Sequence, residues 1–306
     1  MRVFLTGGTG FVGRYVADAI LSDGHDLRCL VREGSEDGLD QREHERVETV
    51  TGDITKPESL RGLMDGCDAV VHLVGIIEEK PSKGVTFQRI HVNGTRNVVE
   101  AAKASGVGRF VHMSANGARA DAPSEYQKTK WEAELLVREA GFARWTVFRP
   151  SIIFGDPGPG RPEFCVQLWR DLIKPFPVTP ILGDGEYELQ PVAVEAVAQG
   201  FAQALRQDEN AAYCVAGRER FPFDTVVDVV SRGAGIEPKP KVHQPEWLSR
   251  AAVKTLSPLG VLPISPAQFE MLMEGNTCDA SAFRERFDIP DIPFVADRLG
   301  YVRERA

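Results

Sequence analysis

One glycine-rich run near the N-terminus constrains the fold of this chain more than any other feature. It joins a short apolar segment to an amphipathic one and reads Thr6-Gly7-Gly8-Thr9-Gly10-Phe11-Val12-Gly13. Gly7 permits a tight turn, Gly10 lets the backbone approach a pyrophosphate, and Gly13 lets a helix pack closely against the preceding strand. The free N–H groups at the start of that helix would hold the anion. The run therefore predicts a dinucleotide-binding turn; the alternative is a glycine-rich loop without a ligand.

The first 150 residues alternate short apolar segments with longer amphipathic ones, which is the pattern of βαβ units on a parallel sheet. The predicted strands are Arg2–Thr6, Asp26–Val31, Val47–Gly52, Ala69–Val74, Arg109–Ser114 and Trp145–Arg149. The predicted helices are Val12–Ser22, Glu58–Met64, Asn93–Ser105 and Ser124–Ala140. We therefore expect an α/β fold with a doubly wound parallel sheet, the Rossmann arrangement.

The sequence changes character after Pro150. Turn-forming residues in GDPGPGRP at 155–162 and KPFPVTP at 174–180 interrupt any long regular element. Further on, Val192–Leu205 is predicted to be a helix and Tyr213–Ala216 a strand that returns to the sheet. The expected Rossmann domain is residues 1–150 plus about 187–216. The expected smaller, mixed C-terminal substrate or interaction region is about 151–186 and 217–306.

Composition narrows the classes of partner. The formal net charge of -8 disfavours binding to nucleic acid or to an anionic membrane surface. The most apolar segment, Ala69–Ile77, is far shorter than the roughly 20 residues of a membrane-spanning helix, and the N-terminus leaves no room for a signal peptide. The five cysteines are scattered without CxxC spacing, so neither a disulfide framework nor a metal site is predicted. We expect a cytoplasmic protein without membrane insertion.

The end of the second predicted strand decides which dinucleotide fits. An acidic residue there accepts hydrogen bonds from the adenosine ribose of NAD, whereas an arginine pairs with the additional phosphate of NADP. The strand ends in Leu30-Val31-Arg32-Glu33. Arg32 predicts NADP(H) and Glu33 predicts NAD(H). We favour NADP(H), because Glu33 falls one place beyond the end of the strand; a solvated surface arginine is the alternative for Arg32.

Two further strand ends carry candidate cofactor contacts. The third strand runs into Gly52-Asp53-Ile54, and an Asp at this place lies near the adenine edge in this fold. Asp53 is equally compatible with a plain turn or helix-capping role. The fourth strand ends in Leu73-Val74-Gly75, where a small residue allows close approach to the cofactor. Gly75 is also compatible with an ordinary turn.

Tyr126 and Lys130 are the candidate catalytic pair. They are four residues apart, so a helix places them on one face. A cation beside a phenol lowers the phenol's pKa, and such a pair can exchange a proton with a carbonyl or an alcohol while hydride moves at a nicotinamide. The alternative is a half-buried tyrosine and a solvated lysine on an ordinary amphipathic helix.

The order of these segments resembles that of the extended short-chain dehydrogenases/reductases. It runs from the glycine-rich turn through Asp53, Val92-Asn93-Gly94-Thr95, the strand ending at Ser114, Tyr126 and Lys130 to Arg149-Pro150-Ser151. The resemblance implies that Tyr126 is the general acid/base and that Lys130 binds the nicotinamide ribose. It also implies that Asn93 supports the active site, with helix capping as the alternative, and that Pro150 and Ser151 line the nicotinamide. The cofactor-binding set is Thr6, Gly7, Gly10, Phe11, Val12, Gly13, Arg32, Asp53, Ile54, Val74, Gly75, Tyr126, Lys130, Pro150 and Ser151.

One position departs from the extended pattern. Family members carry a serine-rich run after the fifth strand, whose last hydroxyl polarises the substrate, and Ala115 stands at the aligned place here. Ser114 lies one residue earlier, so in a strand it would point to the opposite face. The run His112-Met113-Ser114-Ala115-Asn116-Gly117-Ala118 is closer to the atypical branch related to the nucleotide-binding accessory subunit of respiratory complex I. In that branch the fold and the bound NADP(H) are retained while turnover is in question.

These observations leave more than one function open. The first is an NADP(H)-dependent oxidoreductase, or a sugar-nucleotide epimerase or dehydratase, that acts on a small-molecule carbonyl or alcohol. A nucleotide-sugar substrate would need a basic and aromatic pocket, for which the candidates are Arg161, Trp169, Arg170, Lys174 and Arg218. The second is a cofactor-holding structural or assembly subunit of a larger complex. A binding module that senses the redox state of the cofactor fits the same residues, and a monomer, a homodimer and a larger complex are all compatible.

Overall fold

The computed structural model describes residues 1–256 and 266–306, which divide into two compact units. Unit 1 consists of Met1–Pro150, Glu195–Val215 and Ala280–Pro290, and unit 2 of Ser151–Val194, Ala216–Asp279 and Asp291–Ala306. The return to unit 1 begins at Glu195 and not at about 187, because residues 188–193 contribute short strands that pair inside unit 2. Ala280–Pro290 also belongs to unit 1, where Phe283 packs edge-on against Phe148.

Unit 1 is built on one seven-stranded parallel sheet, which confirms the expected doubly wound α/β fold. Its strand order is β11-β6-β5-β4-β1-β2-β3, and the order reverses between β1 and β4. The strands are β1 (Arg2–Thr6), β2 (Asp26–Val31), β3 (Val47–Thr51), β4 (Ala69–His72), β5 (Arg109–Met113), β6 (Arg144–Pro150) and β11 (Ala211–Val215). In such sheets a dinucleotide lies across the carboxyl ends of the strands at this reversal.

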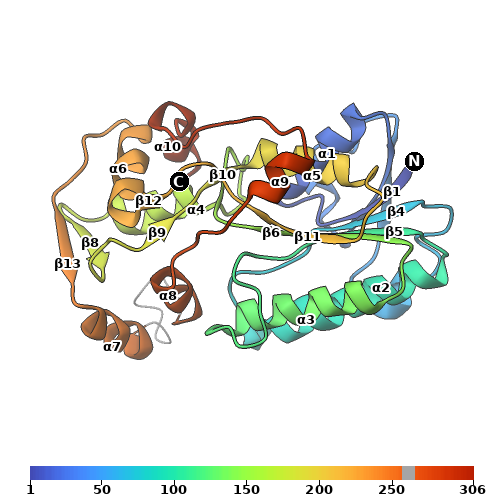
Figure 1. Ribbon diagram of the computed structural model, residues 1–306, viewed down its shortest axis with the longest axis horizontal. Coiled ribbons are helices and arrows are strands. Elements are labelled where there is room, and N and C mark those ends of the chain that lie inside the picture. The colour runs from blue at the N-terminus through green and yellow to red at the C-terminus, as the bar shows by residue number, and fades with distance from the viewer. Residues whose placement is uncertain (257–265) are drawn as a thin grey trace. The chain divides into compact units, whose positions relative to one another are not determined.

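Helices cover both faces of the sheet (Figure 1). Two lie on one face, α2 (Gly94–Ala104) and α3 (Glu125–Glu139), and three lie on the other, α1 (Phe11–Ser22), α5 (Val194–Ala204) and α9 (Ser281–Arg286). The core under α2 and α3 joins Phe4, Val70 and Phe110 of the strands to Val98 and Val137 of the helices. Alternation of side chains along the strands and helical spacing in the covering segments produce this two-sided packing.

Two predicted helices differ from what the structure contains. Glu58–Met64 is instead a short 3-10 turn, Pro57–Leu60, which cannot continue because Gly62 adopts a positive φ of 70°. The helix expected over Asn93–Ser105 starts earlier, as a π-helix at Gln88–Asn93 that runs directly into α2. The π-helix changes which side chains of this segment are buried, with consequences for the site.

In its described residues, unit 2 has three two-stranded sheets packed with short helices. The pairs are β7 (Ile153–Phe154) with β10 (Val192–Ala193), β9 (Glu188–Leu189) with β12 (Phe221–Pro222), and β8 (Thr179–Leu182) with β13 (Lys241–Gln244). The helices are α4 (Phe164–Gln167), α6 (Phe223–Gly233), α7 (Glu246–Leu256), α8 (Pro266–Met273) and α10 (Tyr301–Arg305). Their core includes Phe154, Trp169, Phe223 and Phe294. Across both described stretches of the chain, no helix is long and apolar enough to span a bilayer.

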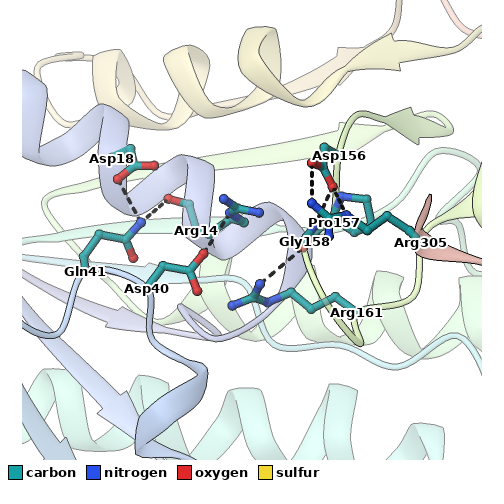
Figure 2. A network of polar contacts seen from close by, with 9 residues as sticks. All are labelled: Arg14, Asp18, Asp40, Gln41, Asp156, Pro157, Gly158, Arg161 and Arg305. Carbon is teal, nitrogen blue, oxygen red and sulfur yellow. Dashed lines mark hydrogen bonds and ion pairs between the residues drawn. The ribbon is translucent and has the colours of Figure 1, made fainter. Parts of the chain in front are cut away.

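Side-chain contacts fix the start of unit 2 and its C-terminal helix to each other (Figure 2). Arg305 of α10 forms two hydrogen bonds with the Asp156 carboxylate, at 2.8 and 3.0 Å. The same carboxylate accepts the N–H of Gly158 at 2.8 Å, and Arg161 donates to the carbonyl oxygen of Pro157 at 3.3 Å. The turn-rich segment after β7 is therefore an ordered loop held by the end of the chain.

Candidate dinucleotide-binding and catalytic site

The glycine-rich run forms a turn that tolerates no larger residue at two of its positions. Gly7 has a positive φ of 82°, and a Cβ there would lie 3.2 Å from the backbone of Val74. A Cβ on Gly13 would lie only 2.0 Å from the Gly7 carbonyl oxygen. Gly10 donates its N–H to that same oxygen at 3.0 Å and begins α1 without a side-chain cap. The N–H groups of the first turn of α1 are thus left for an anion.

Helix α1 is also fixed to the segment that follows β2 (Figure 2). The amide of Gln41 donates to the carbonyl oxygen of Arg14 at 3.0 Å and to the Asp18 carboxylate at 2.8 Å. The Arg14 guanidinium pairs with Asp40 at 3.0 Å. These contacts hold the N-terminal half of α1 in place, and with it the glycine-rich turn.

The other residues of the run present their backbones and not their polar side chains. Thr6 is fully buried, and its hydroxyl lies 2.6 Å from Nδ1 of His72. Phe11 and Val12 are half-buried, and the ring of Phe11 lies edge-on to Tyr15 at 6.1 Å. The Thr6 hydroxyl is therefore committed to the core, and its carbonyl oxygen accepts the N–H of Leu73 at 3.2 Å within the sheet.

A hollow of about 570 Å³ opens where β2 and β3 end. We call it the β2–β3 hollow; its lining residues are Arg32, Glu33, Ser35, Thr51, Gly52, Asp53, Lys56 and Ser59. Arg32 and Glu33 are both exposed, so the structure brings both candidate readers of the cofactor to one place. It also adds Lys56, a second cation that sequence reasoning did not single out.

Asp53 and Ile54 take different roles at the end of β3. The Asp53 carboxylate accepts the backbone N–H of Thr55 at 2.8 Å and its hydroxyl at 2.9 Å, so the turn-forming role is present. Asp53 still lines the β2–β3 hollow. Ile54 is buried, and its carbonyl oxygen accepts a hydrogen bond from Asn97 of α2. Its side chain therefore belongs to the core beneath α2.

Tyr126 and Lys130 lie one turn apart on α3, which begins at the capping residue Ser124. Lys130 is 2% exposed, and its Nζ donates to the carbonyl oxygen of Met113 at 2.7 Å. Burial lowers the pKa of Lys130 to about 8, opposed by the charge of Glu134. Burial raises the pKa of Tyr126 to about 12, which is opposite to the direction expected from a neighbouring cation. Desolvation of the phenol is the cause of this shift.

Gly75 lies at the sheet edge beside Lys130. A Cβ at this exposed position would lie 3.2 Å from Lys130 Nζ and 3.6 Å from Nε2 of His91. Val74 beside it is half-buried and packs at the edge of the core under α2 and α3. The small residue after β4 is thus the point where a ligand could approach Lys130.

Ser114 and Ala115 follow β5 as buried residues. The N–H of Ser114 donates to the Phe148 carbonyl oxygen at 2.7 Å, so the ladder between β5 and β6 continues one residue past Met113. Ser114 is 2% exposed, and among the described residues its hydroxyl has no hydrogen-bond partner. Strand alternation puts it on the same face as His112, in the direction expected from the sequence.

Asn93 is the residue for which the resemblance implied a supporting role. It is exposed at the junction of the π-helix and α2, and its side chain forms no capping hydrogen bond. The buried residue of this turn is His91, which sequence reasoning missed. Its ring lies edge-on to Tyr126, with 5.4 Å between ring centroids. The one signal in the sequence was a lone histidine three residues before Gly94.

Pro150 and Ser151 stand at the boundary of the units. Pro150 is buried and ends β6, where its carbonyl oxygen accepts the N–H of Asn116 at 2.9 Å. Ser151 begins unit 2 and donates its hydroxyl to the Gln190 carbonyl oxygen at 2.5 Å. The Ser151 hydroxyl is thus used to hold the short strands of unit 2.

The profile of the NAD dependent epimerase/dehydratase family matches residues 3–216, well over half of the chain. The chain belongs to this family. The match includes the glycine-rich run, Tyr126 and Lys130, and it extends to the end of the sheet at β11. Membership in the epimerase/dehydratase family supports a nicotinamide cofactor at the glycine-rich turn.

Individual relatives refine this picture. Over 180 residues the chain is 37% identical to ceramide reductase of Caulobacter vibrioides, covering 59% of this chain and 53% of that protein. Over 232 residues it is 26% identical to NADH dehydrogenase [ubiquinone] 1 alpha subcomplex subunit 9, mitochondrial, of Dictyostelium discoideum, covering 74% and 62%. The resemblance to the complex I subunit is thereby confirmed. The chain spans only about half to three fifths of the length of these two relatives.

A solved structure of the same fold is UDP-glucuronic acid 4-epimerase of Bacillus cereus in complex with UDP-glucuronic acid and NAD. The TM-score is 0.72 at 18% identity, with 100% of this chain and 98% of that chain covered. At this identity the likeness shows the Rossmann-like fold alone.

The candidates for a nucleotide-sugar pocket are mostly engaged in other contacts. Trp169 is buried in the core of unit 2, Arg170 pairs with Asp171 at 2.7 Å, and Arg218 pairs with Asp291 at 2.7 Å. Trp169 is therefore a packing residue of unit 2, and Arg170 and Arg218 form ion pairs. Within residues 1–256 and 266–306, no three His, Cys, Asp or Glu side chains gather as metal ligands would.

Proposed function

We propose that this protein is an NADP(H)-dependent oxidoreductase that interconverts a small-molecule carbonyl and alcohol, with Tyr126 as the general acid/base. The observation that carries the proposal is the place of Lys130 Nζ, 3.2 Å from where a Gly75 Cβ would be and one helical turn from Tyr126. A phenol and a buried ammonium thus lie at the same sheet edge as the glycine-rich turn.

The residues present fit a dinucleotide. Gly7 and Gly13 allow the tight turn, because a Cβ at either position would meet the protein's own backbone, and the start of α1 has no side-chain cap to compete with a pyrophosphate. Gly75 keeps the approach to Lys130 open. When bound, the nicotinamide supplies or accepts the hydride.

The protein's own part in the reaction is to orient the substrate oxygen and move one proton. In the reducing direction Tyr126 donates its phenolic proton to the oxygen of the carbonyl, and in the oxidising direction the phenolate takes it back. Lys130, held by the Met113 carbonyl oxygen at 2.7 Å, offers its remaining N–H groups to the ribose and favours the phenolate by its charge. A pKa of Tyr126 near 12 keeps the phenol protonated at neutral pH, which suits the reducing direction.

The β2–β3 hollow supports NADP(H) over NAD(H). Arg32 and Lys56 both line it, and two cations at the end of β2 favour an additional phosphate. Glu33 lines it as well and is the residue that would favour the unphosphorylated ribose. Asp53 also lines the hollow, but its carboxylate is bonded to Thr55. We infer that the two cations decide the preference.

Tyr126→Phe tests the catalytic part of the proposal. NADPH oxidation would be followed by absorbance against a panel of aliphatic, aromatic and long-chain ketones, the last suggested by the ceramide reductase relative. For any ketone that the wild type reduces, Tyr126→Phe should lower the rate about a hundredfold or more, since general acid catalysis contributes on that scale. Tyr213→Phe, which removes a phenol bonded to Glu209, is the matched control and should retain the rate. Equal rates for wild type and Tyr126→Phe would exclude Tyr126 as the acid.

A second candidate function is a cofactor-holding subunit of a larger complex. It is favoured by Ala115 at the place of the family hydroxyl, by the buried Ser114 hydroxyl, and by the sequence relationship to the complex I subunit. Size-exclusion chromatography of a gentle cell lysate containing the tagged chain separates the two candidates. Elution at the mass of one or two chains opposes the subunit role, and elution in a large assembly supports it.

A further inference from the structure

His91 contacts Tyr126 from a segment that the proposed chemistry does not use. It is 1% exposed and lies in the π-helix Gln88–Asn93. Its ring stacks on Phe87 with centroids 5.4 Å apart at 23°. The edges of this stacked pair meet the Tyr126 ring at 5.7 Å for Phe87 and 5.4 Å for His91. The phenol ring is therefore held by two aromatic neighbours that are themselves fixed to each other.

Both ring nitrogens of His91 have hydrogen-bonding partners. Nδ1 lies 3.0 Å from the hydroxyl of Thr129, and that hydroxyl donates to the carbonyl oxygen of Glu125 at 2.7 Å. Nε2 lies 3.0 Å from the backbone nitrogen of Ile76 and 3.1 Å from its carbonyl oxygen. The ring is therefore bonded on both sides in either neutral tautomer.

The environment keeps this imidazole neutral. Burial lowers the pKa of His91 to about 2, and the charge of Lys130 adds to the effect. A protonated ring would place a second positive charge beside Lys130. The two hydrogen bonds are thus stable across the pH range in which the protein would work.

We propose that His91 is a positioning residue that fixes the Tyr126 phenol relative to the cofactor edge of the sheet. Its Nε2 bond anchors it to Ile76, next to Gly75, and its Nδ1 bond anchors it to Thr129 on the helix that carries Tyr126. Within the π-helix the ring of His91 is buried, whereas Asn93 two residues later is exposed. The inference rests on the proposed function for its purpose, but its geometry does not depend on turnover.

The competing reading is that His91 only fills space. A space-filling role predicts that removal of the hydrogen bonds lowers stability and leaves the phenol unchanged, provided that an aromatic ring is kept. A positioning role predicts that loss of the Thr129 hydroxyl changes the environment of the Tyr126 phenol through His91. The same hydroxyl also donates to the carbonyl oxygen of Tyr126 at 3.0 Å, so the His91→Phe background is needed to separate the two routes.

The test is fluorine NMR of protein made with fluorotyrosine. The chain has five tyrosines, and the Tyr126 resonance is assigned as the one that disappears in Tyr126→Phe. The variants are Thr129→Val, His91→Phe and the double variant, and Thr129→Ser restores a hydroxyl. Thr95→Val is the matched control, because it removes the hydroxyl partner of another buried histidine, His72, at 3.0 Å.

We expect Thr129→Val to shift and broaden the Tyr126 resonance, Thr129→Ser to keep it at the wild-type position, and Thr95→Val to leave it unmoved. In the His91→Phe protein, adding Thr129→Val should cause a clearly smaller further shift, because the bond to His91 is already broken and only the contact of Thr129 with the Tyr126 carbonyl oxygen is lost. An unmoved Tyr126 resonance in a folded Thr129→Val protein would overturn the proposal. An equal additional shift in the His91→Phe background would also overturn it, since the effect would then bypass His91.

NADPH binding to the same samples, measured by its fluorescence, separates this inference from the proposed function. If the wild type binds no NADPH while the resonance pattern holds, the cofactor assignment fails and the positioning of Tyr126 stands. If NADPH binds within about threefold of wild type in every variant while the Tyr126 resonance never moves, the positioning role fails alone.

Discussion

Lys130 Nζ donates a 2.7 Å hydrogen bond to the carbonyl oxygen of Met113, the residue that ends β5. This single contact holds a nearly fully buried ammonium at the carboxyl edge of the sheet, with Glu134 one turn further along α3 as its counter-charge. Glu134 is itself fully buried and bonded to Arg149 at 2.8 and 2.5 Å. The counter-charge of Lys130 is therefore itself held in place by Arg149. Burial of the Lys130 ammonium still costs free energy.

The first prediction is that Lys130→Met stabilises the fold while it removes activity. At pH 7 the lysine is protonated in both the folded and the unfolded chain, so the full cost of its lowered pKa is present. Between about pH 8 and the ordinary value of 10.5 the unfolded chain binds more protons, so wild-type stability rises with pH. Denaturant unfolding at pH 7 should show a gain of about 1–3 kcal/mol for Lys130→Met, and the variant should lack that rise.

Lys128→Met is the control for this change. Lys128 lies on the same helix but is partly exposed and pairs with Glu125 at 2.8 Å on the surface. Its replacement should alter the free energy of unfolding by no more than about 0.5 kcal/mol. A Lys130→Met protein less stable than Lys128→Met would contradict the view that burial of the ammonium is destabilising.

The second prediction concerns acid. Burial is the main cause that lowers the pKa of His72 to about 3 and of His91 to about 2, and it holds that of His112 well below 6.5. The unfolded chain takes up these protons below about pH 6.5 and the folded chain does not, so stability falls as the pH drops. Each histidine should contribute about 1.4 kcal/mol per pH unit in this range. Urea unfolding at pH 7.5 and 5.5 measures the total; equal stability at both would refute the neutral buried histidines.

The third prediction isolates His112. It is 1% exposed and stacks on His72 at 5.4 Å, and within the described residues neither of its ring nitrogens has a hydrogen-bond partner. Unpaired buried polar atoms are destabilising, so His112→Leu, a side chain of similar size, should raise the free energy of unfolding by about 1 kcal/mol at pH 7. The variant should also take up one proton fewer than the wild type when it unfolds below about pH 6.5. A loss of stability would show that His112 has a bonded partner in solution.

The fourth prediction uses the glycine-rich turn. A methyl group at Gly13 would meet the Gly7 carbonyl oxygen at 2.0 Å, so Gly13→Ala forces the backbone of the turn to move. We expect a loss of about 1–3 kcal/mol in the free energy of unfolding and a large loss of NADPH affinity. Gly108→Ala is the matched control, because a Cβ there meets no atom within 4 Å. Unchanged NADPH affinity in Gly13→Ala would separate the turn from cofactor binding.

The strands of unit 1 could be predicted from the sequence almost to the residue, because each is a short apolar run bounded by turn residues. The segment after β3 shows where pattern fails. Glu58–Met64 has helical spacing, yet the positive φ at Gly62 stops the 3-10 turn after one round, and spacing carries no information about that backbone angle.

The site residues divide in the same way. The roles of Gly7, Gly13 and Gly75 could be predicted from the sequence, because each position needs a residue without a side chain for a local turn or close contact. His91 could not, because a π-helix departs from the 3.6 periodicity that sequence patterns assume. Asn93 was proposed from the resemblance to the extended family and not from periodicity. Thr6 and Ser151 have hydroxyls whose partners, His72 and Gln190, are remote in sequence.

The most direct test of the account is a comparison of NADPH and NADH binding by fluorescence titration of the wild type, Arg32→Ala, Lys56→Ala and Glu33→Gln. The account predicts that the wild type prefers NADPH by about tenfold or more and that Arg32→Ala removes most of that preference while NADH affinity is unchanged. Lys56→Ala should have a smaller effect in the same direction. NADPH preference that survives Arg32→Ala, or an NADH preference that is lost in Glu33→Gln, would contradict it.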